Sequence, residues 1–309
     1  MATEYIHEVV GQPSIYDPQL RKFKLYFDVP DNVDENTGIL LFIAGFGAHS
    51  NSNIYKKMRK LFAEEYNLVT VQCEYFGWQY MQMEVLEESR ADFCDMGPCQ
   101  AMDNLIALKY VKDYLEDNGI PYSRRKVIAY GHSHGSYLAL LMNSFMPDVF
   151  SFIIDNSAWL FPVYIHAERG FEKTRFHYLI SEIIIDDEIY DLEKRYMGLD
   201  NHSMIVSFQG MLDTLVSPAK KMTFTGSVKN MSIELIGEPC VDGVAFRSIG
   251  HAMDSDFIEI FKYVNGRYRM EMPEDRLIFD ERRFETSKCV YEIISEDGIP
   301  FLICYPKEG

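Results

Sequence analysis

Short apolar runs alternate with segments of helical periodicity along most of the chain, and this alternation limits the fold more than any other feature of the sequence. The runs occupy residues 38–44, 68–73, 126–130, 150–154, 204–208 and 232–236. Strands that are apolar almost throughout are covered on both faces, as in parallel sheets. The intervening segments place apolar residues at helical spacing, for example Leu105, Leu108 and Leu115. We therefore predict an α/β fold with a mainly parallel sheet, helices on both faces and right-handed crossovers.

Two segments that precede these runs show a different pattern. Residues 20–30 alternate apolar and polar side chains and stop at Pro30, which predicts a half-buried strand. Residues 4–10 are expected to pair with it. This pair comes before the parallel part of the sheet in the chain.

The segment Gly131-His132-Ser133-His134-Gly135 fits the G-x-S-x-G pattern of a nucleophile elbow. As a bare string the pattern is weak, because it arises by chance in about one chain of this length in ten. Here it lies between the apolar run at residues 126–130 and an amphipathic helical segment, which is the context the motif requires. Glycines are needed two positions on either side of the serine, where larger side chains would strike neighbouring backbone. Ser133 is therefore the predicted nucleophile.

A serine hydroxyl needs a base to remove its proton and an acid to orient that base. Asp213 lies in the loop after the run at residues 204–208, ahead of Ser217-Pro218, which open a helix. His251 follows Gly250 beyond the last strand of the predicted sheet. We predict that His251 is the base and Asp213 the orienting acid. Asp155, at the end of the run at residues 150–154, is the alternative acid.

Two backbone N–H groups are candidates for an oxyanion hole, which stabilises the charge of a tetrahedral intermediate. His134 directly follows the nucleophile and supplies the first. Phe46, in the Gly45-Phe46-Gly47 loop after the first apolar run, supplies the second, with Gly47 as the neighbouring alternative. A glycine-rich turn that only ends a strand is the other interpretation of that loop.

Two stretches do not fit the strand and helix alternation. Residues 157–200 are too long for a simple crossover and contain helical pieces, so we predict a cap inserted over the carboxyl edge of the sheet. In the tail, residues 289–295 and 299–304 flank Asp297-Gly298 and predict a β-hairpin outside the main fold. The expected division is a core of residues 1–156 and 201–267, a cap of residues 157–200 and a C-terminal β extension of residues 268–309.

Five side chains are candidates for substrate binding. Tyr164, His166 and Arg169 belong to an unusually polar run in the predicted cap, where an arginine could bind an anionic group. A solvated helix face explains the same run. His132 precedes the nucleophile, and Trp78 lies in the long segment 76–100, which has no clear period. Ordinary core packing is the alternative for Trp78.

Composition excludes several other classes of protein. The net charge of −17 opposes a phosphate grip on nucleic acid and attraction to anionic membranes. No apolar run approaches the roughly 20 residues of a membrane span, and residues 1–13 lack the features of a signal peptide, so we expect a cytoplasmic protein. Six cysteines do not make a disulfide scaffold in a chain this long. His132 and His134 diverge across a sharp elbow, so neither a metal nor another cofactor is expected.

The elbow, the Gly45-Phe46-Gly47 loop, Asp213 and Gly250-His251 together resemble the α/β-hydrolase superfamily over about residues 20–265, and their order Ser, Asp, His is the order in that superfamily. More narrowly, residues 154–158, 210–215 and 248–253 are similar to a little-characterised bacterial hydrolase family found near flagellin-glycosylation genes. Ala44 departs from that likeness, because many relatives carry histidine there. The resemblance implies an ester or N-acyl group on a sugar, such as a nonulosonic acid, as substrate. The charge of −17 would repel such an anion at long range, so arginines of the cap would have to overcome the field.

We therefore expect a serine hydrolase, a carboxylesterase or deacylase, that works through an acyl-enzyme. Its expected partner is a small acyl ester or an acylated sugar, and the C-terminal hairpin could pair with a second copy to form a homo-oligomer. An acyltransferase or a peptidase would use the same triad. From another class, a catalytically inactive hydrolase fold could serve as a carbohydrate- or protein-binding module.

Overall fold

The computed structural model describes residues 2–16, 20–83, 86–88, 95–162, 165, 169–171, 174–177 and 179–308. For residues 86–87, 169–171, 174–177 and 180–181 it describes the backbone but not the side chains. Within the described part of the chain, no helix is both long and apolar enough to cross a membrane.

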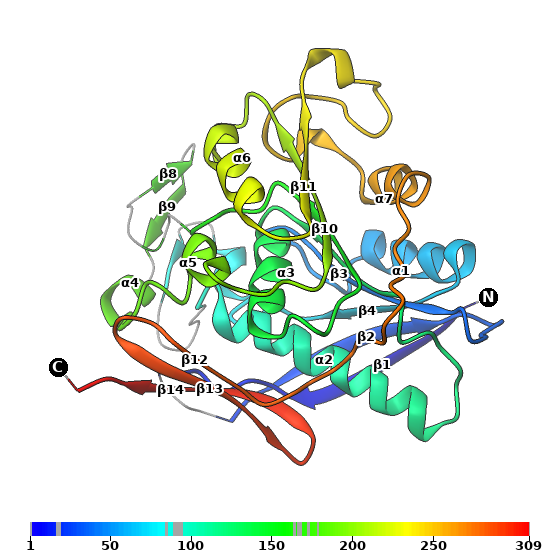
Figure 1. Cartoon of the computed structure of the whole chain (residues 1–309), viewed down its shortest axis with the longest axis horizontal. Coiled ribbons are helices and arrows are strands. Elements are labelled where there is room, and N and C mark those ends of the chain that lie inside the picture. The colour runs from blue at the N-terminus through cyan, green and yellow to red at the C-terminus, as the bar shows by residue number, and fades with distance from the viewer. Residues whose placement is uncertain are drawn as a thin grey trace.

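An eight-stranded sheet, as far as the described residues show, forms the centre of the molecule in the order β1-β2-β4-β3-β6-β7-β10-β11 (Figure 1). Its strands are β1 (Thr3–Val10), β2 (Lys22–Val29), β3 (Gly38–Ile43), β4 (Leu68–Cys73), β6 (Val127–His132), β7 (Phe152–Asn156), β10 (Met204–Gly210) and β11 (Met231–Ile236). All neighbours from β4 to β11 are parallel, whereas β2 runs antiparallel to both β1 and β4. The mainly parallel sheet predicted from the apolar runs is confirmed.

Helices cover both faces of this sheet. They are α1 (Asn53–Tyr66), α2 (Pro98–Asp117), α3 (His134–Phe145), α6 (Pro218–Ser227) and α7 (Phe257–Asn265). Successive residues of a strand point to opposite faces. Phe42 of β3 packs with Phe62 of α1 and Phe257 of α7, whereas the adjacent Leu41 joins the cluster that contains Leu105 of α2. Burying one such side chain contributes about 1.5 to 3 kcal/mol, so both faces add to the stability.

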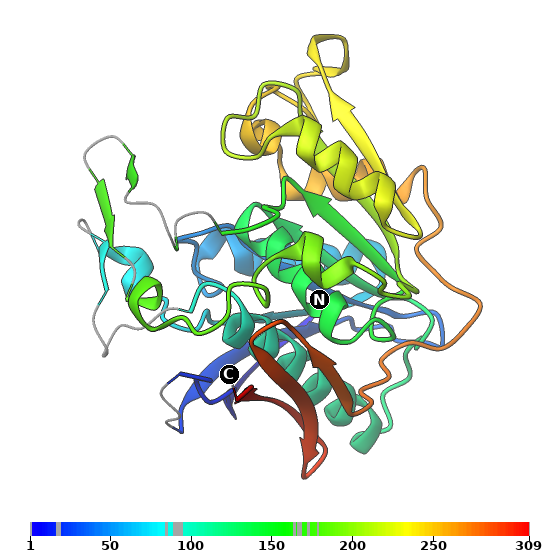
Figure 2. The same ribbon diagram turned by 60° about the vertical axis from the view of Figure 1, so that its left-hand side comes forward.

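The region predicted to be a cap contains short elements: β8 (Arg169–Phe171), β9 (Thr174–His177), α4 (Ile180–Ile183) and α5 (Leu192–Tyr196). Strand β9 pairs with β8 and also with β5 (Leu86–Glu87), which belongs to the segment at residues 76–100. Figure 2 shows these strands at the left of the molecule, to one side of the large sheet. A small sheet therefore joins two segments whose association the sequence did not predict. The domain boundaries at residues 157 and 200 stay a prediction.

The C-terminal extension forms a separate antiparallel sheet of β12 (Arg282–Glu285), β13 (Cys289–Glu296) and β14 (Ile299–Pro306). The predicted hairpin is confirmed, and Asp297 and Gly298 have the positive φ values, 49° and 82°, that favour a tight hairpin turn.

This extension forms a sheet of its own, as predicted, and it also packs against the main fold. Tyr291 and Leu302 are buried in the core cluster that covers the α2 side of the sheet. The side chain of Gln12 donates to the carbonyl of Leu302 at 2.8 Å and accepts from its N–H at 2.8 Å. In Figure 1 the hairpin lies beside α2. One face of the hairpin is apolar, and packing on the main fold removes that face from water.

Candidate active site

The elbow residues form a sharp turn between β6 and α3. Ser133 has φ 53° and ψ −113°, a conformation that is unusual for a residue with a side chain. A Cβ at Gly135 would lie 2.1 Å from the carbonyl oxygen of Ile43, and one at Gly131 would lie 2.3 Å from the backbone of Ser136. The N–H of Ser133 donates to the carbonyl of Asn156 at 2.8 Å. The two glycines thus let the chain turn sharply enough to hold Ser133 at the carboxyl end of the sheet.

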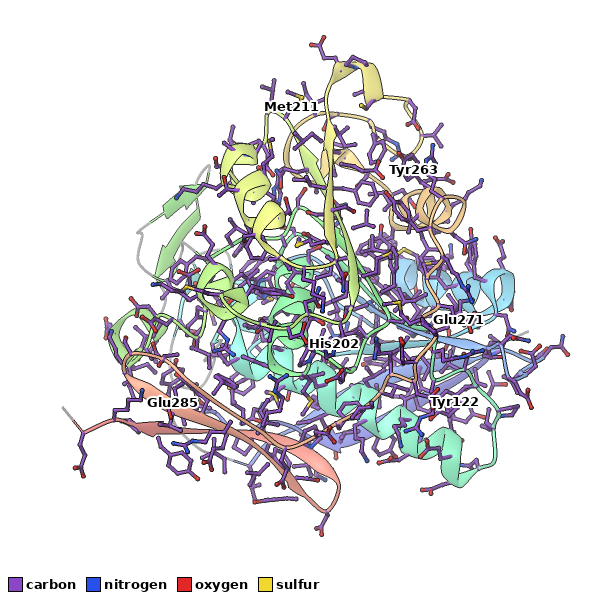
Figure 3. All side chains as sticks on the ribbon, viewed as in Figure 1. Tyr122, His202, Met211, Tyr263, Glu271 and Glu285 are labelled. Carbon is purple, nitrogen blue, oxygen red and sulfur yellow. The ribbon has the colours of Figure 1, made fainter. Side chains whose placement is uncertain are left out.

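The structure brings the three predicted triad residues together. The hydroxyl Oγ of Ser133 lies 2.7 Å from Nε2 of His251, and Nδ1 of His251 lies 2.8 Å from Oδ2 of Asp213. A carboxylate only accepts hydrogen bonds, so Nδ1 carries the hydrogen and Nε2 can accept from the serine. Figure 3 labels His202 and Met211, which precede and follow β10 in the chain. Asp213 comes shortly after Met211 in the sequence.

Asp213 is held by four donors. Its Oδ1 accepts from the N–H groups of Leu215 at 2.8 Å and Val216 at 3.0 Å. Its Oδ2 accepts from Nε2 of Gln209 at 2.7 Å as well as from His251. Burial alone would raise the pKa of Asp213, but the hydrogen bonds from His251 and from the backbone more than offset it and lower this pKa below its usual value. The carboxyl group is therefore ionised at neutral pH.

The loop that carries His251 is fixed by close backbone contacts. A Cβ at Gly210 would lie 2.2 Å from the carbonyl oxygen of Gly250, so only glycine lets the end of β10 approach this loop. Ala252 and Met253 have φ values of 54° and 55°. The N–H of Ala252 donates to Oγ of Ser157 at 3.1 Å. The strained conformation after His251 is thus tied to the end of β7.

The two oxyanion candidates both lie close to the nucleophile. His134 is the first residue of α3, where helix N–H groups have no partner within the helix. A Cβ at Gly45 would lie 3.8 Å from Cβ of Ser133, and the rings of Phe46 and His134 meet edge to face at 6.3 Å. The structure therefore brings the Gly45-Phe46-Gly47 loop against the elbow. The roles of the two N–H groups stay a prediction.

The side chains of His132 and His134 have different surroundings. The ring of His134 is fully buried, its Nε2 lies 2.6 Å from Oε1 of Gln100, and burial lowers its pKa to about 3. His132 is partly buried, with Nδ1 3.3 Å from Nδ2 of Asn156, and burial followed by the nearby His251 lowers its pKa to about 4. Both rings are neutral at pH 7. Among the residues that the structure describes, no three His, Cys, Asp or Glu side chains are grouped to hold a metal.

The remaining substrate-binding candidates are only partly located. The ring of Trp78 packs edge to face on His49 at 4.4 Å, and Gln82, from the same segment, donates to the carbonyl of Gly47 at 2.8 Å. Trp78 therefore lies beside the loop that carries Phe46. Tyr164 and His166 lie outside the described residues. Arg169 begins β8, but its side chain is not described.

Asp155, the alternative acid, has a different partner. Its Oδ2 lies 2.6 Å from Nζ of Lys221 and accepts from Oγ of Ser207 at 2.7 Å. Its Oδ1 accepts from the N–H of Ala158 at 2.8 Å. The side chains of Asp155 and Lys221 are both 0% exposed, so this is a fully buried ion pair. It is Asp213, and not Asp155, that contacts His251.

Several residues around the site were missed by the sequence analysis. Gln209 donates to Asp213, Gln100 orients the ring of His134, and Asn156 contacts both the elbow and His132. Gln209 had a signal: it is a polar residue at the end of an apolar run, four positions before the candidate acid. Gln100 lies far from the elbow in sequence and had no such signal.

Comparison with known proteins establishes the fold. A family model described as "Protein of unknown function (DUF2920)" matches residues 78–178, which include the elbow. No curated protein matches the sequence.

Solved structures that resemble this one include esterases and other hydrolases of low sequence identity. Est1E from Butyrivibrio proteoclasticus has a TM-score of 0.54 at 15% identity, over 84% of this chain and 96% of that one. Esterase 2 of Thermogutta terrifontis has a TM-score of 0.55 at 12% identity, over 87% and 97%. A putative dienelactone hydrolase from Klebsiella pneumoniae has a TM-score of 0.51 at 13% identity, over 86% and 100%. The chain has the α/β-hydrolase fold that the motifs implied.

Proposed function

We propose that this protein is a serine hydrolase that cleaves an ester or N-acyl bond through an acyl-enzyme. The observation that carries the proposal is the continuous hydrogen-bonded chain from the Ser133 hydroxyl through His251 to Asp213. A base within hydrogen-bond reach of a hydroxyl, itself oriented by a carboxylate, is the arrangement that activates a serine.

In this mechanism His251 Nε2 takes the proton of Ser133 as Oγ attacks the substrate carbonyl. The negative charge on the tetrahedral intermediate is stabilised by the N–H groups of Phe46 and His134, and one such donor is worth about 10² to 10³ in rate. His251 then gives the proton to the leaving alcohol or amine. A water molecule, deprotonated by the same imidazole, releases the acyl group from Ser133. Asp213 keeps the imidazole in the required tautomer throughout.

The proposed substrate is a small acyl ester or an acylated sugar. Solved neighbours include esterases, and one structure of Est1E is described with bound ferulic acid. The sequence likeness to a family near flagellin-glycosylation genes favours a sugar that carries an O-acyl or N-acyl group. Neither source identifies the acyl group. A cytoplasmic location and self-association through the C-terminal sheet also stay predictions, and light scattering on the full chain tests the second.

An active-site fluorophosphonate probe tests the mechanism without knowledge of the substrate. Wild type should be labelled covalently and Ser133→Ala should not. Ser144→Ala is the matched control, because Ser144 lies on the same helix α3 and its hydroxyl donates to the carbonyl of Leu141 within that helix. This control should label at the wild-type rate. A folded wild type that stays unlabelled would instead favour a binding module on an inactive hydrolase fold.

Wild-type protein that has not been exposed to the probe is then assayed on a panel of p-nitrophenyl acyl esters, O- and N-acetylated sugars and short peptides. Product analysis separates the remaining alternatives: a free carboxylic acid indicates hydrolysis, and an acylated acceptor sugar indicates transfer. Release of a peptide-derived amine would indicate a peptidase.

A further inference from the structure

Gln209 donates a hydrogen bond to the candidate catalytic acid, a contact that core packing alone does not require. It is the second-to-last residue of β10 and is fully buried. Its Nε2 lies 2.7 Å from Oδ2 of Asp213, and this is the oxygen that also accepts from Nδ1 of His251 at 2.8 Å. One carboxylate oxygen is therefore shared between a permanent neutral donor and the candidate catalytic base.

The orientation of the Gln209 amide is fixed by its neighbours. Besides Asp213, its Nε2 faces the carbonyl oxygens of Gly210 and Val216, each at 3.5 Å. An amide turned by 180° would place its oxygen against a carboxylate and two carbonyls, so only the observed orientation is favourable. Its Oε1 is buried and has no hydrogen-bond partner among the residues that the structure describes. A buried acceptor without a partner costs free energy, which indicates that the donor contact to Asp213 outweighs this cost.

The other titratable groups near this contact either have different partners or are neutral. Lys221 of α6 interacts with Asp213, but its Nζ is held at 2.6 Å by Asp155 and at 3.0 Å by the carbonyl of Ala158. His132 of the elbow is neutral at pH 7. Gln209 is thus the side chain, apart from His251, that donates directly to the Asp213 carboxylate in the described structure.

We propose that Gln209 is a positioning residue that fixes the Asp213 carboxylate and limits how strongly it attracts the proton of His251, and so sets the acidic limit of activity. A donor on Oδ2 spreads part of the negative charge away from the imidazole. Without it, the carboxylate holds an imidazolium more firmly, and the base becomes available only at higher pH. This inference rests on the proposed function, because it assumes that His251 is the base.

The test measures the rate of fluorophosphonate labelling between pH 4 and 9. Gln209→Met keeps the volume and removes the donor. We expect the midpoint of its acidic limb to move up by about one pH unit, and its maximal rate to fall about three- to tenfold. With an ester substrate, kcat should fall while KM changes less than about twofold, because Gln209 does not touch the substrate.

Two further variants make the result specific. Gln209→Glu restores the donor, because a buried carboxyl beside the Asp213 carboxylate stays protonated through the acidic limb, and its midpoint should match wild type. Gln72→Met is the matched control: Gln72 is a buried glutamine of β4 that accepts from Arg59 at 3.1 Å. It should lower stability without moving the midpoint.

A folded Gln209→Met whose midpoint equals that of wild type overturns the inference. Should Gln209→Met fail to fold, Gln209→Glu decides: a displaced midpoint counts against the role of the donor, and a retained midpoint supports it. Failure of the proposed function looks different, because then wild type itself is not labelled.

Discussion

The carboxyl ends of β7 and β10 each present an aspartate, and the two are used differently. Asp155 at the end of β7 is fully buried and paired with Lys221. Asp213 after β10 is paired with His251, whose side chain is 19% exposed. Both carboxylates accept backbone N–H groups. A fully buried ion pair away from the serine makes one aspartate structural, whereas an imidazole that contacts the Ser133 hydroxyl lets the other take part in chemistry.

The carboxyl ends of β7 and β10 also have different roles at the site. The end of β7 holds the elbow through Asn156 and the loop after His251 through Ser157. The loop after β10 supplies the acid. Strand β7 therefore supports the site without contributing a proposed catalytic group.

The largest expected effect tests which aspartate serves the base. Asp213→Asn should lower the labelling rate by about 10³ to 10⁴, because an amide in place of the carboxylate permits the wrong imidazole tautomer. Asp155→Asn should change the rate of its folded fraction less than about tenfold. Labelling kinetics at one pH, with the folded fraction measured by circular dichroism, check both. Equal losses of labelling rate in the two variants would show that the two aspartates do not differ in role.

The second prediction concerns stability. Lys221→Met leaves the buried Asp155 without its counter-charge, which should lower the free energy of unfolding by about 3 to 5 kcal/mol. The double variant Asp155→Asn with Lys221→Met removes both charges and should recover most of the loss. Urea unfolding of the two single variants and the double variant measures the coupling. Additive losses would show that the two groups do not act as a pair.

The next prediction concerns His134, the residue after the nucleophile. The folding stability that it contributes should depend on pH more strongly than that of a histidine with an unshifted pKa. The pKa of His134 is lowered to about 3, so between its unfolded value near 6.5 and 3 the unfolded chain binds a proton that the folded protein does not. Folding stability contributed by neutral His134 is therefore present above pH 6.5 and falls by about 1.4 kcal/mol per pH unit as the pH decreases through this window. His134→Gln should lose this slope.

His202 provides the matched control with the opposite sign. Its ring lies between Asp148 at 2.5 Å and Asp200 at 3.0 Å, and their hydrogen bonds raise its pKa. The stability that it contributes is fully present below its unfolded value and is lost as the pH rises through the folded value. Urea unfolding from pH 4 to 8 should give changes of opposite sign for His134→Gln and His202→Gln. The same sign in both would contradict the assignment.

The smallest expected effect comes from the hydrogen bond that joins the end of β7 to the loop that carries His251. Ser157→Ala removes the acceptor for the N–H of Ala252, beside His251. We expect a loss of about 1 kcal/mol in stability and a few-fold slower labelling, because the loop keeps its other contacts. Asn143→Ala, in the last turn of α3, is a control that should affect stability alone. An unchanged rate for Ser157→Ala would show that the loop needs no support from β7.

Local patterns were sufficient for much of the fold. Residues 68–73 were predicted as a strand and form β4 over the same residues, because a continuous apolar run needs cover on both faces. The triad positions followed from the same logic, since each candidate lies in a loop at the sheet's carboxyl edge. Strand β12, Arg282–Glu285, was missed because a short polar segment has no period to detect.

Long-range partners could not be read in the same way. The sequence around Asp155 resembles that around any acid at a strand end, and only the fold brings Lys221 to it. The contact of Gln100 with His134 likewise depends on how α2 packs beside α3. Such pairings depend on tertiary packing that no local window contains.

The bonds between Gln12 and Leu302 have a consequence for how the protein is made. They join residues that are 290 positions apart, and Leu302 is also part of the main core. A growing chain on the ribosome therefore lacks this piece of the core until residue 302 has been added. The apolar surface on the α2 side stays open to other molecules until β13 and β14 have emerged, so this side of the core can close only after they are made.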